Sequence, residues 1–149
     1  MTELQPQRPY IGVHVIIIKD NKLLLMKRTV KNSMDGMFAL VAGKMDPYES
    51  PRAAAVREVQ EEIGIEILTE DLEYIATVHH AGTDYRTEKI DVVELYFKTD
   101  KWQGVPVILE KDKASELDFF PLDNLPQPIP KGLIFALEAL NGGPSFIEN

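Results

Sequence analysis

Short apolar stretches recur along the chain and predict most of its strands. Residues 11–18 are almost continuously apolar, which is typical of a strand covered on both faces. A polar turn separates this stretch from a second one at residues 23–26, so the two are expected to form a hairpin. Further strands are predicted at residues 38–41, 72–78, 90–97 and 117–120, with polar connections at 29–37 and 82–89.

Two segments carry the start and stop signals of helices. Residues 51–63 follow Ser50, a favoured N-cap, begin with Pro51 and end before Gly64, a typical C-terminal stop. Residues 132–140 follow three closely spaced prolines and predict a closing amphipathic helix. Because helices fall between and after the strands, the predicted fold class is α/β (α+β), with a mixed central sheet flanked by helices.

Size and composition predict one globular domain. The chain has 149 residues, of which 44% are hydrophobic and 27% are charged, and we expect residues 1–149 to form a single domain. The absence of cysteine excludes disulfides, thiolate zinc sites and thiol catalysis. No apolar run reaches the roughly 18 residues of a membrane helix, and residues 1–10 lack the pattern of a secretion signal. We therefore expect a cytoplasmic protein with no membrane partner.

The charge of the chain is acidic and unevenly distributed. Its 24 acidic and 16 basic side chains give a net charge of -8, which argues against stable nucleic-acid binding through a basic surface. Residues 49–73 alone contain eight acidic and two basic side chains. Such a cluster is ordinarily a solvated face, so the spacing of its members decides whether it has a further role.

Three carboxylates of the first predicted helix share one face. Glu58, Glu61 and Glu62 are spaced three and four residues apart, and like charges at that spacing repel. They also oppose the helix dipole near its C-terminal end. A divalent cation explains the arrangement, because clustered carboxylates are ligands for Mg²⁺ or Mn²⁺. We expect these carboxylates to be exposed and to lie apart from the apolar stripe of the same helix, which is formed by Val56, Val59 and Ile63.

A basic residue lies inside this acidic cluster. Arg57 precedes Glu58, and Glu49 lies eight residues before Arg57 in the loop that leads into the helix. An ion pair between Arg57 and Glu49 would tie the loop to the helix and hold the ligands in place. Taken singly, each of these residues is explained as a solvated helix side chain.

Taken together, they form one motif. Its fixed positions are Gly43, Glu49, Arg57, Glu58, Glu61, Glu62 and Gly64, with aliphatic residues at Val59 and Ile65. This 23-residue run resembles, without a gap, the signature of the Nudix hydrolases, the MutT-like family. The apolar strands before it and the segment 116–126 after it also fit that family.

The resemblance implies a Nudix-type α/β/α sandwich that hydrolyses a small-molecule nucleoside diphosphate derivative. In this family Mg²⁺, with Mn²⁺ as an alternative, is held by the motif glutamates, here Glu58, Glu61 and Glu62. A backbone carbonyl before the motif glycine, here that of Ala42, often adds a ligand. Water attacks a phosphorus atom, and the metal neutralises the charge that develops. Glu58 is the first candidate for the general base, while the identity of the base and the number of metal ions are open.

The resemblance also implies roles for residues outside the helix. Glu110 matches a carboxylate that some relatives supply from a later loop. Arg28 aligns with a phosphate-contacting arginine, although a surface charge at the end of a strand is an equal alternative, and Lys44 is the second predicted substrate-binding residue. The complete set of predicted catalytic residues is Glu49, Arg57, Glu58, Glu61, Glu62 and Glu110.

The chain departs from the family pattern in two places. Many relatives have Trp-x-Leu-Pro-Gly-Gly before the motif, whereas residues 38–43 are Phe-Ala-Leu-Val-Ala-Gly, which reshapes the metal loop without removing a carboxylate. Tyr48 stands where glycine is frequent, which predicts an ordinary backbone conformation there.

The three histidines are weaker candidates. His79 and His80 are neighbours on a predicted strand, so they should point to opposite faces and cannot chelate one ion together. His14 lies within an apolar strand and is interpreted as a core or pocket-lining residue.

The substrate is decided outside the motif. The markers of ADP-ribose, dinucleoside-polyphosphate and NADH hydrolases are absent or misplaced, so a (deoxy)nucleoside triphosphate, cleaved to a monophosphate and pyrophosphate, is the default expectation. The alternatives are an ADP-ribose or nucleotide-sugar hydrolase, and a catalytically silent nucleotide-binding module on the same fold. The intact motif glutamates argue against the silent module. A monomer and a homodimer are both compatible with the sequence.

Overall fold

The structure is a computed structural model that describes residues 8–31, 34–85 and 88–149. Its helices are α1 (Pro51–Ile63), α2 (Lys131–Leu140) and the short 3-10 helix η1 (Thr69–Asp71). Its strands are β1 (Tyr10–Lys19), β2 (Lys22–Arg28), β3 (Phe38–Ala39), β4 (Val41–Lys44), β5 (Glu73–Tyr85), β6 (Glu88–Thr99), β7 (Ala114–Pro121) and β8 (Phe146–Glu148).

The strands of the described residues form one mixed sheet. Its order is β3-β2-β1-β6-β5-β8, while β4 pairs with β1 and β7 pairs with β2. The pairs β1–β6 and β5–β8 are parallel, and the remaining pairs are antiparallel. The predicted fold class, a mixed central sheet flanked by helices, is confirmed.

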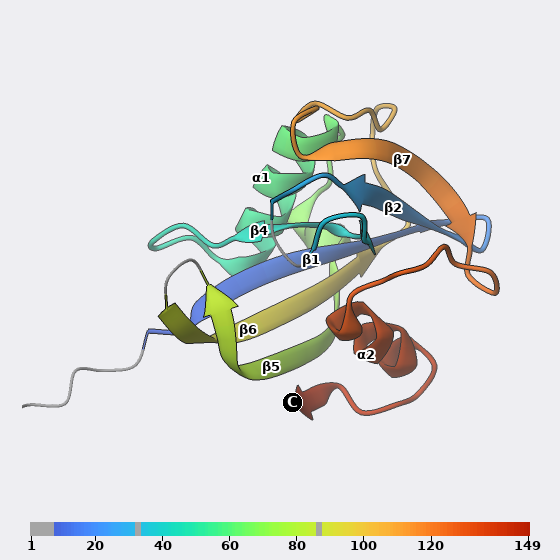
Figure 1. The fold of residues 1–149 in the computed structure, drawn as a ribbon. Coiled ribbons are helices and arrows are strands. Elements are labelled where there is room, and N and C mark those ends of the chain that lie inside the picture. Colours follow the sequence, from blue (N-terminus) through green and yellow to red (C-terminus); the bar gives the residue numbers. More distant parts are fainter. Residues whose placement is uncertain (1–7, 32–33, 86–87) are drawn as a thin grey trace, which may run out of the picture.

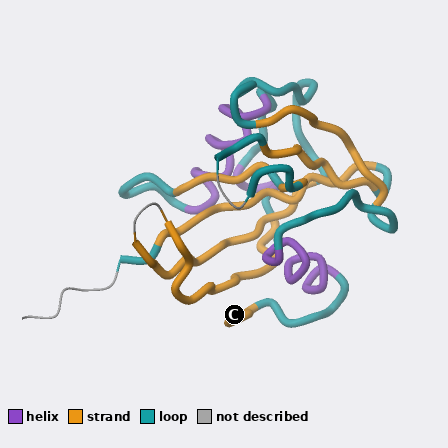
Figure 2. The backbone as a smooth tube through the Cα atoms, viewed as in Figure 1, coloured by secondary structure: helices purple, strands orange, loops and turns teal. Residues whose placement is uncertain are grey.

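Helices α1 and α2 cover opposite faces of the sheet, as Figures 1 and 2 show. Alternate residues of β1 decide which core they join. Val13, Val15 and Ile17 pack in the core under α1, whereas Ile16 packs with Leu133 of α2. Because side chains along a strand alternate between faces, one apolar strand supplies both cores. The molecule is therefore an α/β/α sandwich.

The predicted hairpin between the first two strands is confirmed. Lys19 pairs with Lys22, which leaves a two-residue turn at Asp20 and Asn21. Both turn residues have positive φ angles, 51° and 59°, as a tight turn that matches the twist of the strands requires. Aspartate and asparagine tolerate this conformation better than most residues.

The boundaries of α1 follow its capping signals. The Ser50 hydroxyl accepts a hydrogen bond from the Ala53 N–H at 3.2 Å, and Pro51 begins the helix. Gly64 ends it in the left-handed conformation with φ of 73°, where its N–H donates to the Gln60 carbonyl. The buried apolar face contains Ala54, Ala55, Val59 and Ile63, and Val56 from the predicted stripe is only half-buried.

Two parts of the sheet differ from the prediction. The connection expected at residues 82–89 is largely strand, because β5 extends to Tyr85 and β6 begins at Glu88. These hairpin ends are polar and solvent-exposed where described, so they lack the apolar pattern from which strands are predicted. Strand β8 was not predicted, and β7 is longer than expected. Residues 86–87, residues 32–33 of the expected polar connection and residues 1–7 of the N-terminal segment lie outside the described residues.

Among the described residues, no helix is both long and apolar enough to cross a membrane.

Candidate functional site

Helix α1 packs against β4, and this packing places Glu58 directly over Gly43. A Cβ atom at position 43 would collide with the carboxyl group of Glu58, so the contact depends on glycine. Strand β4 is aligned by antiparallel pairing with β1, in which Val13 lies opposite Gly43 and His14 opposite Ala42. The motif glycine and the first glutamate of the cluster therefore form one packed unit.

Glu62 lies deeper in the same contact. Its side chain is buried, and the residue is 7% exposed. Its Oε2 accepts a hydrogen bond from the Ala42 N–H at 3.3 Å, and its Oε1 lies 3.9 Å from Nη1 of Arg28. The expectation that all three helix carboxylates are exposed is wrong for Glu62, because its position borders the core stripe and α1 presses it onto β4. It is also wrong for Glu58, whose side chain is only 13% exposed.

Burial changes the protonation of this cluster. The pKa of Glu62 is raised to about 7, mainly by burial; Arg28 opposes the shift, and the carboxylates of Glu58 and Glu110 add to it. Burial also raises the pKa of Glu58, although its hydrogen bond with Arg57 acts in the opposite direction. Ionised Glu58 and Glu62 therefore destabilise this region unless a cation accompanies them.

Arg57 ties the cluster together from the other side. Its Nε and Nη2 donate to the two carboxylate oxygens of Glu49 at 2.8 and 2.9 Å, and its Nη1 donates to Glu58 at 2.8 Å. Longer bonds reach Glu61 at 3.3 Å and the carbonyl of Lys44 at 3.0 Å. The predicted ion pair with Glu49 is confirmed, and its hydrogen bonds lower the pKa of Glu49 to about 2.

The loop before α1 adopts a conformation that the sequence did not predict. Tyr48 has a φ of 63°, in the left-handed region, so the expectation of an ordinary backbone there is wrong. This bend lets the Glu49 N–H donate to the Asp46 carbonyl, while the Asp46 N–H donates to Glu49 Oε1 at 3.0 Å. The tight loop presents Glu49 to Arg57, and the Tyr48 side chain is left fully exposed.

Glu61 lies at the rim of the cluster rather than inside it. Its side chain is 53% exposed and contacts Arg57. In the part of the chain that the structure describes, no three carboxylate or imidazole side chains lie close enough to enclose one ion. The donor set still fits Mg²⁺, which binds proteins through one or two carboxylates and completes its shell with water and substrate phosphates. Because Gly43 has no Cβ atom, the Glu58 carboxylate can lie directly against β4, next to Ala42.

The predicted residues outside α1 lie at different distances from this cluster. Arg28, Glu62 and Glu110 line one small cavity, in which Lys113 forms an ion pair with Glu110. Lys44 is farther out, with its Nζ 5.3 Å from the ring centre of Tyr10. The structure therefore brings Arg28 and Glu110 to the carboxylates and places the Lys44 side chain against an aromatic ring.

A larger cavity of about 660 Å³ opens beside the cluster. Arg28, Ala42 and Gly43 line it, and these residues contact Glu58 and Glu62. His14 also lines the cavity, in agreement with its interpretation as a core or pocket-lining residue. The cavity also contains Glu94 and Tyr96, which were not predicted. The signal was present, because Glu94 is a charged residue within the predicted apolar strand at residues 90–97.

The two adjacent histidines contact different carboxylates. His79 Nε2 lies 3.3 Å from Asp91, and His80 Nε2 lies 3.1 Å from Glu94. This agrees with the expectation that they point to opposite faces of the strand.

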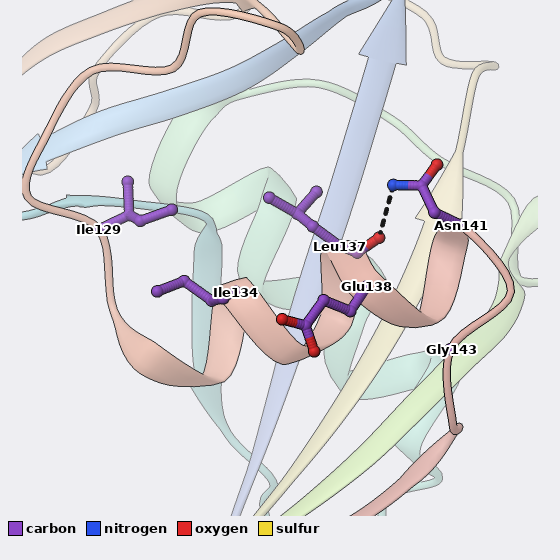
Figure 3. Close-up of a pocket in the computed structure, with 6 residues that line it drawn as sticks. All are labelled: Ile129, Ile134, Leu137, Glu138, Asn141 and Gly143. Atoms are coloured by element: carbon purple, nitrogen blue, oxygen red, sulfur yellow. Dashed lines mark hydrogen bonds between the residues drawn. The ribbon is translucent and has the colours of Figure 1, made fainter.

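A third cavity lies beside α2 (Figure 3). Its lining is mostly apolar, and the Asn141 side-chain amide donates to the Leu137 carbonyl at 3.1 Å within it. It is lined by Ile129, Ile134, Leu137, Glu138, Asn141 and Gly143, and none of these residues belongs to the predicted site. The carboxylate cluster and the larger cavity beside it are therefore the candidate site.

The fold and this site define a class of protein. An α/β/α sandwich in which a glutamate-rich helix packs on a glycine-containing strand is the arrangement of the NUDIX domain, and the family model for that domain matches residues 8–138. The chain belongs to the MutT-like Nudix hydrolase family.

Particular relatives agree with this assignment. The chain is 35% identical to an ADP-ribose pyrophosphatase of Methanocaldococcus jannaschii over 119 residues, which are 80% of this chain and 66% of that protein. It is 42% identical to a CTP pyrophosphohydrolase of Escherichia coli K12 over 65 residues, which are 44% of this chain and 47% of that protein. It thus spans less than two thirds of these relatives. The crystal structure of a MutT NUDIX hydrolase from Burkholderia pseudomallei has a TM-score of 0.79 at 30% identity and covers 90% of this chain and 99% of that one.

Proposed function

We propose that the protein is a Mg²⁺-dependent pyrophosphohydrolase that cleaves a nucleoside diphosphate linked to another group. The leading substrate class is a (deoxy)nucleoside triphosphate, with a nucleoside monophosphate and pyrophosphate as products. The observation that carries the proposal is the pair of Glu58 and Glu62, which pack against Gly43 and Ala42 of β4, two residues that line a cavity of about 660 Å³. A pair of largely buried carboxylates beside a cavity suits a cation and a polyphosphate.

The reaction requires few protein groups. A water oxygen bonds to one phosphorus of the anhydride and the bond from that phosphorus to the bridging oxygen breaks. The bridging oxygen leaves with the other phosphorus, so a nucleoside triphosphate yields a monophosphate and pyrophosphate. Glu58 would accept the proton of the attacking water, and burial raises its pKa, which makes its carboxylate a stronger base. Mg²⁺, when held by Glu58 and Glu62 with Glu61 at the rim, supplies neutralisation of the charge on the phosphate oxygens.

The remaining residues would position these groups. Arg57 and Glu49 hold the Glu58 carboxylate from outside, because Arg57 bonds both at distances under 3 Å. Arg28 lines both cavities and would bind a phosphate that displaces its long contact with Glu62. Glu110 is close enough to influence the pKa of Glu62 and is the second candidate for the base.

The names of the relatives support a nucleotide substrate and leave ADP-ribose as an alternative. The E. coli relative is named for CTP, a nucleoside triphosphate, and the M. jannaschii relative is named for ADP-ribose. ADP-ribose is therefore the second candidate substrate, since the alignment with that relative covers 80% of this chain. Both compounds contain the diphosphate that the site would bind.

A nucleotide panel with two variants tests the proposal. Purified protein with Mg²⁺ should release pyrophosphate or phosphate from at least one nucleoside triphosphate, nucleotide sugar or ADP-ribose. Glu58→Gln and Glu62→Gln should each reduce turnover by about 10²–10⁴-fold, because each removes an ionised group that the transition state needs. Glu73→Gln, an exposed carboxylate of β5, is the matched control and should retain activity.

Two results would overturn the proposal. Retained Mg²⁺-dependent hydrolysis in both Glu58→Gln and Glu62→Gln would show that the chemistry lies elsewhere. Tight nucleotide binding with no turnover of any compound in the panel would identify the silent binding module instead.

A further inference from the structure

The cavity contains a charged residue that the Nudix motif does not account for. Glu94 of β6 lines the cavity beneath Gly132 of α2, on the face of the sheet opposite to α1. Its side chain is 18% exposed. A carboxylate this deep needs partners, and its two oxygens have different ones.

One oxygen of Glu94 is fully engaged by the protein. Oε2 accepts hydrogen bonds from the Tyr96 hydroxyl at 2.6 Å and from His80 Nε2 at 3.1 Å. Asn149 donates its side-chain N–H to His80 Nδ1 at 2.9 Å, so the proton of the neutral ring is on Nε2, where it points at Glu94. A Cβ atom at Gly132 of α2 would collide with Oε2 and with the Tyr96 hydroxyl, so glycine leaves the space for this pair.

The other oxygen of Glu94, Oε1, has no such hydrogen bond among the described residues. Oε1 has His14 Nε2 as its near neighbour at 3.7 Å, which is beyond hydrogen-bond distance. The His14 ring is stacked on Tyr96 with centroids 4.6 Å apart, so it is not free to turn toward Glu94. Oε1 therefore has capacity to accept a hydrogen bond from a molecule in the cavity.

Glu94 is ionised at neutral pH. Burial acts to raise its pKa, but the hydrogen bond from His80, the proximity of His14 and the hydrogen bond from Tyr96 outweigh it and lower the pKa to about 2. An ionised carboxylate accepts hydrogen bonds and cannot donate one. The Glu94 carboxylate thus gives the cavity a negatively charged hydrogen-bond acceptor.

The rest of the cavity suits a flat ring joined to phosphates. Val92, Leu40, Pro130 and Leu133 provide apolar walls of the cavity, and Arg28, Ala42 and Gly43 line it beside the carboxylate cluster. A nucleotide with its phosphates at the carboxylate cluster would place its base against these walls and its edge at Glu94.

We infer that Glu94 selects nucleotides whose base carries an exocyclic amino group, namely cytosine, adenine or guanine, against uracil and thymine. This inference rests on the proposed function only for the placement of the phosphates. An amino group donates to Oε1, whereas the carbonyl that replaces it in uracil or thymine brings an acceptor against a negative charge. The ring N–H that uracil retains lies between two carbonyl oxygens, so it can donate to Oε1 only with these acceptors beside the carboxylate. A site built around a buried hydrogen bond therefore discriminates against the analogue that forms this bond less well.

Binding of nucleoside monophosphates tests the inference without turnover. CMP carries an exocyclic amino group where UMP carries a carbonyl group. AMP and IMP differ in the same way on a purine ring. In calorimetric titrations the affinity of the wild-type protein should be about 10- to 100-fold higher for CMP than for UMP, and for AMP than for IMP. This is the range expected for a hydrogen bond to a charged group. Ribose 5-phosphate, which has no base, should bind no more tightly than UMP.

Glu94→Gln provides the decisive variant. The side chain keeps its shape but offers an N–H donor, so the CMP to UMP ratio should fall at least tenfold and move toward UMP. A merely structural role for Glu94 would weaken both ligands equally. Glu73→Gln is the matched control and should keep the wild-type ratio. Thermal unfolding of each variant establishes that it is folded.

The outcomes separate this inference from the proposed function. Equal wild-type affinities for CMP and UMP, within twofold, would overturn base selection even in an active enzyme, and so would an unchanged ratio in folded Glu94→Gln. A preference for CMP and AMP in a protein that hydrolyses nothing would refute the proposed function and support base selection.

Discussion

Tyr48 holds an unfavourable backbone conformation at the entrance to α1. Its φ of 63° is in a region that costs a non-glycine residue about 1–2 kcal/mol, and its side chain is fully exposed and gains nothing from packing. The bend is nevertheless needed, since it delivers Glu49 to Arg57. At this position the requirement of the loop outweighs the preference of the residue.

Replacing Tyr48 should therefore stabilise the protein. Tyr48→Gly is expected to raise the free energy of unfolding by about 0.5–1 kcal/mol, because glycine adopts positive φ freely but is more flexible when unfolded. Thermal unfolding should show an increase of a few degrees. Tyr48→Ala is the matched control, because it removes the ring yet keeps the Cβ, and it should give no increase. A loss of stability in Tyr48→Gly would show that the tyrosine ring has a contact of its own.

At the scale of the element, α1 and β4 act as one unit. The capping residues decide where α1 begins and ends, and Gly43 decides how closely its carboxylates approach the strand. The collision that glycine avoids is with the flexible end of Glu58, not with backbone. A side chain at position 43 would thus displace a functional group while leaving the fold in place.

Gly43→Ala tests this unit. We expect a loss of stability below about 1 kcal/mol, since the Glu58 carboxyl can rotate away. Turnover should fall by about 100-fold, because a displacement of about 1 Å in a positioned group has effects of that size. Steady-state kinetics with the best substrate of the panel, together with thermal unfolding, measures both quantities. Full activity in a folded Gly43→Ala protein would contradict the close packing of Glu58 on β4.

The same elements show what could be predicted from the sequence. The limits of α1, the hairpin at Asp20 and the ion pair of Arg57 with Glu49 follow from local signals, namely caps, turn residues and spacing. The burial of Glu62 could not be predicted in this way, because it depends on how closely α1 lies on β4.

The Glu94 site depends on contacts that are even more remote in the sequence. It requires the parallel pairing of β1 with β6, which brings His14 opposite Tyr96, and the close approach of Gly132 from α2. None of these contacts leaves a periodic or spacing signal. The polar ends of β5 and β6 were missed for the related reason that their pairing, rather than burial, makes them strands.

Over the whole molecule, ionisable groups contribute to stability with opposite signs. Glu49 and Glu94 have pKa values lowered to about 2, so their contributions are present above about pH 4.5 and are lost as the pH falls toward 2. Glu62 has its pKa raised to about 7, so the folded protein holds that proton more tightly than the unfolded chain does. Stability from Glu62 is therefore highest below about pH 4.5 and declines as the pH rises through 7.

Glu62→Gln should remove that decline. In a chelator and at pH 8, we expect the variant to be more stable than the wild type by about 1–3 kcal/mol, because no buried charge forms, while at pH 4.5 the two should be similar. Mg²⁺ should stabilise the wild type at pH 8 and have little effect on the variant. Thermal unfolding across pH, with and without Mg²⁺, measures this. Wild-type stability that rises between pH 5 and 8 without metal, by as much as in the variant, would contradict the burial of an ionisable Glu62.

The two faces of β1 have a consequence for how such a protein diversifies. Its α1 side supports the proposed reaction, and its α2 side carries Glu94, Tyr96 and Gly132. The two sets belong to different elements that meet only along the cavity, so a change in one set need not displace the other. If Glu94 selects the base as inferred, substitutions beneath α2 would alter which nucleotide is accepted without removing a motif carboxylate, and a single ancestral scaffold could acquire new substrates without passing through an inactive intermediate.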